Sequence, residues 1–263
     1  MYTIVMAYQK SYNYNPTYQP GHSKPFALSR SKIEQFIQCP RCFYLDRRLG
    51  IKQPRTPPFT LNSTVDELYK REFDELRKAK KQHPIQIKYK LDVIPAQHKM
   101  LDVWRENFKG IRTIHKETNL EIFGALDDLW INQNDEYIVV DYKATARSQP
   151  ITQLGDAFYH DGYRRQLEVY QWLLRQNGLN VSDTGYWLYA TAKKKSERFD
   201  GMLKFDQRLI EHPGDDSWIE PMLPKIKSCL ESDQIPEVGK ECGYCPYAKE
   251  RTQMTLNYLK NRA

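Results

Sequence analysis

Hydrophobic residues recur at two spacings along the chain, and the spacing separates predicted helices from predicted strands. Apolar positions three and four residues apart predict helices over roughly 31–39, 62–80, 95–108, 162–178 and 217–232. Runs rich in β-branched and aromatic residues predict strands at 111–115, 119–131, 136–144, 184–191 and 201–205. The polar turn 132–135 joins two of these strands as a hairpin. We therefore expect an α/β domain with a mixed central sheet flanked by helices.

Other segments give weaker patterns. Residues 1–24 are rich in Tyr, Asn, Gln and Pro and show no periodicity, which predicts either a flexible tail or one that packs through its tyrosines. Residues 83–93 fit a loop or a strand, and 241–262 fit a cysteine-bearing turn that leads into a helix. Ser31 and Glu34 have capping-box spacing, with Ser29 as the alternative N-cap. Residues 25–263 are expected to form a single domain.

Composition narrows the class of protein. The 263 residues carry 40 Lys and Arg against 33 Asp and Glu, and this net charge of +7 moderately favours a polyanionic partner. No apolar run approaches the roughly 18–20 residues that cross a bilayer, and the N-terminal residues lack the apolar core of a signal peptide. We expect a soluble, cytoplasmic protein that has no membrane partner.

Acidic residues and a lysine interrupt the most strand-like region. Alternate strand residues share a face, so Asp141 and Lys143 point the same way. An antiparallel hairpin can bring Asp127 close to Asp141, whereas Asp128 faces the other side. Carboxylates bind Mg²⁺ or Mn²⁺, and a lysine can orient water or stabilise charge on a phosphoryl oxygen. An isolated D-x-K is more often a structural ion pair, so the neighbouring motifs decide the interpretation.

Those motifs resemble the RecB-like branch of the PD-(D/E)XK nuclease superfamily. G-x-x-D at 124–127, D-x-K at 141–143 and Q-x-x-x-Y at 166–170 follow the family's order. The segment SRSKIEQFIQCPRCFYL resembles the family's opening helix, which leads into Cys-Pro. The resemblance spans roughly residues 27–250 and implies a restriction-endonuclease-like core.

The resemblance implies a role for each matching residue. Asp127 and Asp141 would bind the metal ion together with the backbone carbonyl of Tyr142, and Lys143 would be the catalytic lysine. Relatives often carry a metal-binding His in a G-x-x-x-H pattern on the helix before the sheet. The matching segment NSTVDELYK places Asp66 there instead. A carboxylate is a competent ligand, so we expect Asp66 to be a third metal ligand; the alternative is an ordinary solvent-facing residue.

A cleft is expected beside the following helix. The resemblance implies that Gln166 and Tyr170 line it, although Tyr170 also fits core packing. Arg164, Arg165 and the loop lysines 193–195 are candidates for phosphate contacts, and a solvated charged surface is the alternative for each.

Two C-x2-C pairs stand near opposite ends of the chain, Cys39 with Cys42 and Cys242 with Cys245. Four thiolates can bind zinc or a 4Fe–4S cluster, and either would join the two ends. Relatives use a 4Fe–4S cluster, usually with one N-terminal and three C-terminal cysteines. This chain departs from that pattern with two and two, and Cys42 could supply the missing ligand. We therefore expect a 4Fe–4S cluster on the four cysteines; zinc, which the two-and-two pattern suits equally well, is the alternative. Cys229 is expected to be a small core residue.

The resemblance implies a DNA nuclease, most simply an exonuclease of recombination, repair, or CRISPR or phage DNA processing, acting on single- or double-stranded DNA. A helicase, CRISPR or recombination partner is implied in the same way, because the chain has no P-loop motif of its own. The alternatives are a non-catalytic nucleic-acid-binding module on the same fold and an RNA-directed nuclease on a related fold.

Overall fold

The computed structural model describes residues 17–54, 57–195 and 198–261. The strands in this part are β1 (Phe26–Ser29), β2 (Val93–Pro95), β3 (Ile111–His115), β4 (Leu120–Gly124), β5 (Asp128–Asn132), β6 (Tyr137–Arg147), β7 (Thr184–Lys193) and β8 (Phe205–Pro213). The helices are α1 (Arg30–Gln38), α2 (Pro40–Arg47), α3 (Thr60–Ala79), α4 (Pro84–Lys88), α5 (Leu101–Trp104), α6 (Phe158–Gln176), α7 (Ile219–Glu231) and α8 (Tyr244–Lys260). The predicted α/β class is confirmed.

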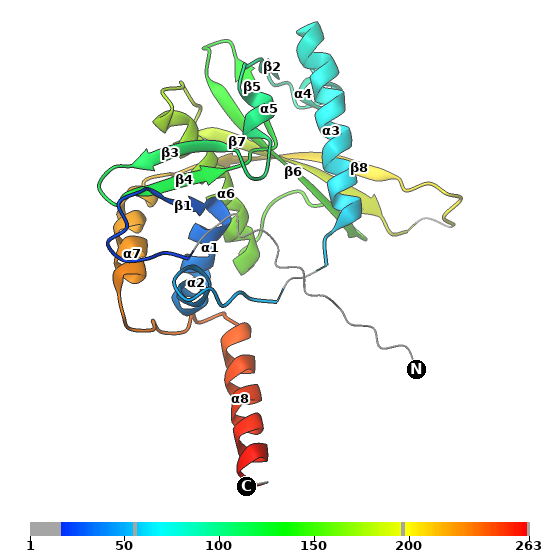
Figure 1. Ribbon diagram of the computed structural model, residues 1–263. Helices are drawn as coiled ribbons and strands as arrows, with labels where there is room; N and C mark the ends of the chain where they lie inside the picture. The colour runs from blue at the N-terminus through cyan, green and yellow to red at the C-terminus, as the bar shows by residue number, and fades with distance from the viewer. Residues whose placement is uncertain (1–16, 55–56, 196–197, 262–263) are drawn as a thin grey trace, which may run out of the picture.

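The strands form two sheets (Figure 1). The larger has the order β2-β5-β6-β7-β8, and only β6 and β7 run parallel in it. The smaller has the order β1-β4-β3, with β1 parallel to β4. Helix α3 packs against one side of β6 and α6 against the other. This arrangement makes β6 a central strand with helices on both faces.

The predicted strand 119–131 is wrong in one respect, because it is two strands in different sheets. β4 ends at Gly124, and β5 begins at Asp128 as the antiparallel partner of β6. Leu126 lies in the connection and is fully buried. Period-two alternation continues through such a connection, so the pattern of side chains does not reveal the change of sheet. Asp127 consequently lies in the connection immediately before β5.

Three other local predictions need correction. The segment 83–93 contains helix α4, in which the His83 side chain accepts a hydrogen bond from the Ile85 N–H and so caps the first turn. The helix expected over 95–108 is reduced to α5. The strand expected at 201–205 instead begins at Phe205 and continues to Pro213. β8 lies at the sheet edge and most of its residues are polar, so it lacks the alternating hydrophobic pattern of a strand.

The N-terminal helix pair follows from the Cys-Pro sequence. Pro40 lacks an N–H group and therefore ends α1, but its fixed φ suits the first turn of α2. Ser29 occupies the N-cap position of α1, so the Ser31–Glu34 capping box is wrong. Cys39 is the N-cap of α2, where its Sγ accepts a hydrogen bond from the Cys42 N–H at 3.4 Å. The first cysteine pair is thus built into a helix start.

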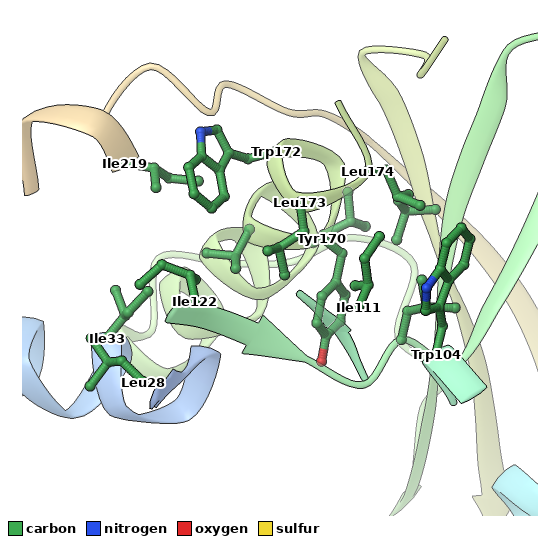
Figure 2. Packing of buried hydrophobic residues seen from close by; sticks show 14 of the residues in the cluster. Leu28, Ile33, Trp104, Ile111, Ile122, Tyr170, Trp172, Leu173, Leu174 and Ile219 are labelled. Carbon is green, nitrogen blue, oxygen red and sulfur yellow. The ribbon is translucent and has the colours of Figure 1, made fainter. Parts of the chain in front are cut away.

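The main core surrounds α6. Figure 2 shows side chains of α6 packed among residues of β1, α1, β3, β4 and α7, including Leu28, Ile33, Ile111, Ile122, Trp172, Leu173, Leu174 and Ile219. All of these residues are buried. Because α6 is fixed by this core, the polar residues at its β6-facing edge are held in place as well.

The chain ends differ in their packing. Of the predicted tail, residues 1–16 lie outside the described part. Tyr18 is buried, and its backbone N–H donates to the Arg47 carbonyl. At the other end, α8 projects from the body (Figure 1), and none of its residues is buried against the described part of the chain. None of the described helices is long and apolar enough to span a membrane.

Candidate active site and cysteine site

The centre of the candidate active site lies on β6. The carboxylate of Asp141 is fully buried and ion-paired with the ammonium of Lys143. Burial raises the pKa of Asp141 to about 7; Lys143 opposes this rise, and the nearby Asp127 adds to it. The Oδ1 atom of Asp141 has no hydrogen-bond partner among the described residues. A buried carboxylate oxygen without a donor is well suited to bind a cation.

Asp127 is fixed to the same strand by its backbone and its side chain. Its Oδ2 accepts a hydrogen bond of 2.9 Å from the Tyr142 N–H. Its backbone carbonyl accepts a 3.0 Å bond from Nε of Arg105. The structure thus brings Asp127 next to Asp141, as the hairpin predicts.

Helix α3 adds a third carboxylate. Lys70 Nζ lies 2.7 Å from Asp66 Oδ2 and 4.0 Å from Asp127 Oδ1, so this ammonium links the two carboxylates. Burial raises the pKa of Asp66, and the negative charge of Asp127 adds to the rise. The Oδ1 atom of Asp66 is buried without a hydrogen-bond partner in the described ranges. Asp66 therefore faces the site and not bulk solvent.

Sequence reasoning missed Lys70, although the signal was present. A residue four positions after Asp66 lies on the same helix face, so a helix that carries Asp66 into the site also carries Lys70.

Gln166 and Tyr170 extend the site along α6. Lys143 Nζ donates to Gln166 Oε1 at 3.3 Å, and Gln166 Nε2 donates to the Tyr170 hydroxyl at 3.3 Å. The Tyr170 ring is buried in the main core (Figure 2), so Tyr170 both packs and bonds to Gln166. A Cβ atom at Gly124 would lie 2.7 Å from Cε1 of Tyr170. This close approach explains the glycine of the G-x-x-D motif.

The two arginines before Gln166 are engaged within the protein. Arg165 makes two 2.8 Å bonds to the Glu34 carboxylate of α1. Arg164 bonds to Asp161 at 2.6 Å and to the Gly155 carbonyl at 2.9 Å. Each arginine would have to leave these partners to bind a phosphate.

Asp128 faces the opposite side of β5, as its position in the strand predicts. Its carboxylate is fully buried, accepts hydrogen bonds from Arg77 and Arg105, and accepts a 2.6 Å bond from the Tyr142 hydroxyl. This cluster lies behind the strand that carries Asp141. Because Arg105 also bonds to the Asp127 carbonyl, the cluster supports the connection that holds Asp127.

The donor set fits a hard divalent cation. Asp66 on α3, Asp127 before β5 and Asp141 on β6 supply carboxylate oxygens beside Lys70 and Lys143. Oxygen is the ligand atom that Mg²⁺ and Mn²⁺ prefer. A cavity of about 630 Å³, lined by residues that include Ser31, Lys32 and Phe108, is a separate feature of the molecule. None of these carboxylates is among its described lining residues.

The cysteines of the two C-x2-C motifs lie together, which confirms that the N- and C-terminal segments are joined at a cysteine site. Sγ separations are 3.8 Å for Cys39–Cys245, 3.5 Å for Cys42–Cys242 and 3.4 Å for Cys42–Cys245. All four sulfur atoms lie within 4.8 Å of one another. Cys229 lies elsewhere, partly buried against the main core.

Backbone N–H groups favour the thiolate form of Cys39, whereas burial raises the pKa values of Cys42 and Cys245. Burial opposes ionisation of Cys39, but N–H groups of Gly239 and Cys42 donate to its Sγ, and its pKa falls to about 7. A Cβ atom at Gly239 would lie 1.9 Å from the Gln38 carbonyl oxygen, so only glycine allows this approach. A thiolate supported by N–H donors is a competent metal ligand.

Comparisons with known proteins bear on this geometry. A model of the PD-(D/E)XK nuclease superfamily matches residues 27–249. No curated protein matches the chain. A solved structure described as "Crystal structure of SSO0001" is 15% identical to this chain, and the alignment covers 84% of each chain with a TM-score of 0.38. The matched residues include the connection that carries Asp127, strand β6 with Asp141 and Lys143, and the helix that carries Gln166. By this match the chain belongs to the PD-(D/E)XK nuclease superfamily.

Proposed function

We propose that the protein is a metal-dependent nuclease that hydrolyses phosphodiester bonds in DNA. The observation that carries the proposal is the chain of contacts that links Asp66 and Asp127 through Lys70 and Asp141 to Lys143, with carboxylate oxygens of Asp66 and Asp141 left without described hydrogen-bond partners. Lys70 and Lys143 offset two of the three negative charges, and a bound divalent cation would compensate the remainder. A non-catalytic binding module has no need of such a site.

Each residue has a distinct chemical role in this proposal. Asp66, Asp127 and Asp141 would hold Mg²⁺ or Mn²⁺ with the Tyr142 carbonyl, and the bound ion would supply an acidic water and polarise the scissile phosphate. Lys143 holds its ammonium beside Asp141, where it can orient the attacking water or stabilise charge on the phosphoryl oxygens. Gln166 accepts a hydrogen bond from Lys143 and limits where that ammonium points.

The family resemblance supports DNA as the substrate, and the net charge of +7 supports a polyanion in general. We propose exonuclease action in recombination, repair, or CRISPR or phage DNA processing, with a helicase or recombination partner to open duplex DNA. These finer assignments rest on the RecB-like motifs alone.

The test uses end-labelled single- and double-stranded DNA with Mg²⁺, with Mn²⁺ and with a chelator. Wild type is expected to degrade DNA only with metal, and Lys143→Ala to lower the rate by at least about a hundredfold. Lys116→Ala, an exposed lysine, is the matched control. Metal-independent cleavage, or equal rates for wild type and Lys143→Ala, would refute the catalytic proposal. DNA binding without cleavage would favour the non-catalytic module.

For the cysteine site we propose a single tetrahedral zinc ion that joins α1 and α2 to the C-terminal segment. Zinc–sulfur bonds of about 2.3 Å place tetrahedral ligands about 3.8 Å apart, close to the 3.4–3.8 Å separations of these thiols. In a 4Fe–4S cluster each cysteine binds a different iron. The irons and sulfides between the thiolates would hold the sulfur atoms beyond mutual contact, which is wider than they stand here.

Metal analysis of anaerobically purified protein distinguishes the two centres. One zinc per chain in a colourless protein is expected, and Cys242→Ser should lower that content. Four irons per chain with a broad visible absorbance would instead establish the cluster.

A further inference from the structure

Lys70 occupies a position between two carboxylates of the candidate active site. Its ammonium is 2.7 Å from Asp66 and 4.0 Å from Asp127, and its side chain is 23% exposed. Asp66 and Lys70 stand one helical turn apart on α3, so the helix presents an anion and a cation to the same place. The ammonium offsets negative charge that would otherwise accumulate there.

A divalent cation that bound Asp66 Oδ2 and Asp127 Oδ1, the two oxygens nearest Lys70, would compete with the Lys70 ammonium for one position. Mg²⁺ binds carboxylate oxygens at about 2.0–2.1 Å, so an ion held by Asp66 and Asp127 would occupy the space the ammonium now fills. The two positive charges also repel each other across a partly buried site. Metal binding through these two oxygens therefore requires that Lys70 move away.

We propose that Lys70 is a second active-site lysine, which competes with metal for the Asp66 and Asp127 carboxylates and moves to the substrate phosphate when metal binds. This inference rests on the proposed nuclease function. The four-carbon stem of lysine is flexible and its ammonium is a mobile point charge. Lys143 differs, because it is ion-paired with Asp141 and bonded to Gln166. The released Lys70 is thus a mobile cation that can neutralise phosphate charge in addition to Lys143.

Calorimetric titration with Mn²⁺ tests the first half of the proposal without any substrate. Lys70→Met removes the competing charge and retains most of the stem, so Mn²⁺ should bind at least about tenfold more tightly than to wild type. Arg71→Met removes a positive charge from an exposed neighbour on the same helix and should leave the affinity unchanged. Asp66→Asn should weaken Mn²⁺ binding.

Turnover of end-labelled DNA at saturating Mn²⁺ tests the second half. Lys70→Met should lower kcat at least about tenfold although it binds metal more tightly, and Lys70→Arg should recover part of the rate. A residue with a purely structural role would not strengthen metal binding while slowing turnover. If Lys70→Met does not fold, the Lys70→Gln and Lys70→Arg variants are compared in the same two assays.

The outcomes separate this inference from the function on which it rests. Unchanged or weaker Mn²⁺ binding by Lys70→Met would overturn the competition with metal, and an unchanged kcat would overturn the phosphate role, even if wild type cleaves DNA. Failure of wild type to bind Mn²⁺ at all would instead overturn the proposed metal-dependent function.

Discussion

Substitution of Asn for each of the adjacent residues Asp127 and Asp128 should affect a different property of the protein. Asp127 lies in the connection before β5 and faces the candidate metal site, whereas Asp128 is buried on the other side with Arg77 and Arg105. Asn is nearly isosteric with Asp, so each substitution removes one charge and little volume. We predict that Asp128→Asn mainly lowers stability and Asp127→Asn mainly abolishes metal binding.

The size of the stability effect follows from what each carboxylate holds. Asp128 is fully buried, accepts from two arginines whose side chains are only 8% exposed, and also accepts from Tyr142 and the Leu129 N–H. Removing one partner of such a buried charge cluster destabilises a protein by about 3–5 kcal/mol. Asp127 is partly exposed, and Asn can still accept from the Tyr142 N–H. Asp127→Asn should therefore change the free energy of unfolding by no more than about 1 kcal/mol.

Urea unfolding of the chelator-treated proteins measures both effects without a contribution from active-site metal. Mn²⁺ titration of the same samples measures binding, and Asp74→Asn serves as the control, because Asp74 bonds to Arg105 but is more exposed. Asp74→Asn should lower the free energy of unfolding by about 1 kcal/mol. Equal losses of stability for Asp127→Asn and Asp128→Asn, or loss of Mn²⁺ binding in both with stability unchanged, would refute the assignment of opposite roles.

Three further predictions concern the frame around the sites. Gly239→Ala should lower the metal content of the purified protein, because its Cβ would collide with the Gln38 carbonyl oxygen. At Gly243 a Cβ would meet nothing within 4 Å, so Gly243→Ala should retain the metal. Elemental analysis of the two purified variants measures the difference. Arg165 holds the pKa of Glu34 below its ordinary 4.5 despite the opposing effect of burial, so this pair stabilises the fold above about pH 4.5 and the stabilisation is lost as pH falls through the lowered pKa. Glu34→Gln should therefore lose about 1–3 kcal/mol at pH 7 and show a shallower acid loss in urea titrations from pH 7 to 3; parallel curves would contradict the pairing. Stripping metal from the cysteine site with a strong chelator should lower Tm by roughly 5–10 °C, which differential scanning calorimetry measures, and an unchanged Tm would show that the site does not stabilise the fold.

Sequence reasoning succeeded where a local pattern has one geometric consequence. Alternation along β6 places Asp141 and Lys143 on one face, and a hairpin opposes β5 to β6 whatever surrounds it. The cysteine pairs were recognisable because their spacing is itself a ligand pattern. These local patterns therefore predicted the positions of most residues in the candidate active site and the cysteine site.

The rest depended on tertiary information that no local pattern holds. The division of 119–131 between two sheets depends on which strands pair, and β1, more than ninety residues earlier, is the partner that β4 takes in parallel. Helix α4 was missed because histidine is an unusual N-cap. The ion pair of Arg165 with Glu34 was not predicted, because Glu34 lies 131 residues earlier in the chain and its spacing from Ser31 indicated a capping box.

The sulfur pairs also set an order of events during synthesis. Cys42 and Cys242 are separated by 200 residues. At about 5–20 residues per second, the first pair leaves the ribosome roughly 10–40 s before the second. Throughout that interval the N-terminal thiols have no C-terminal partners, and premature oxidation of either would leave the site incomplete. Closure of the cysteine site is therefore a late step, and newly made chains pass through a form whose C-terminal helix is not yet attached.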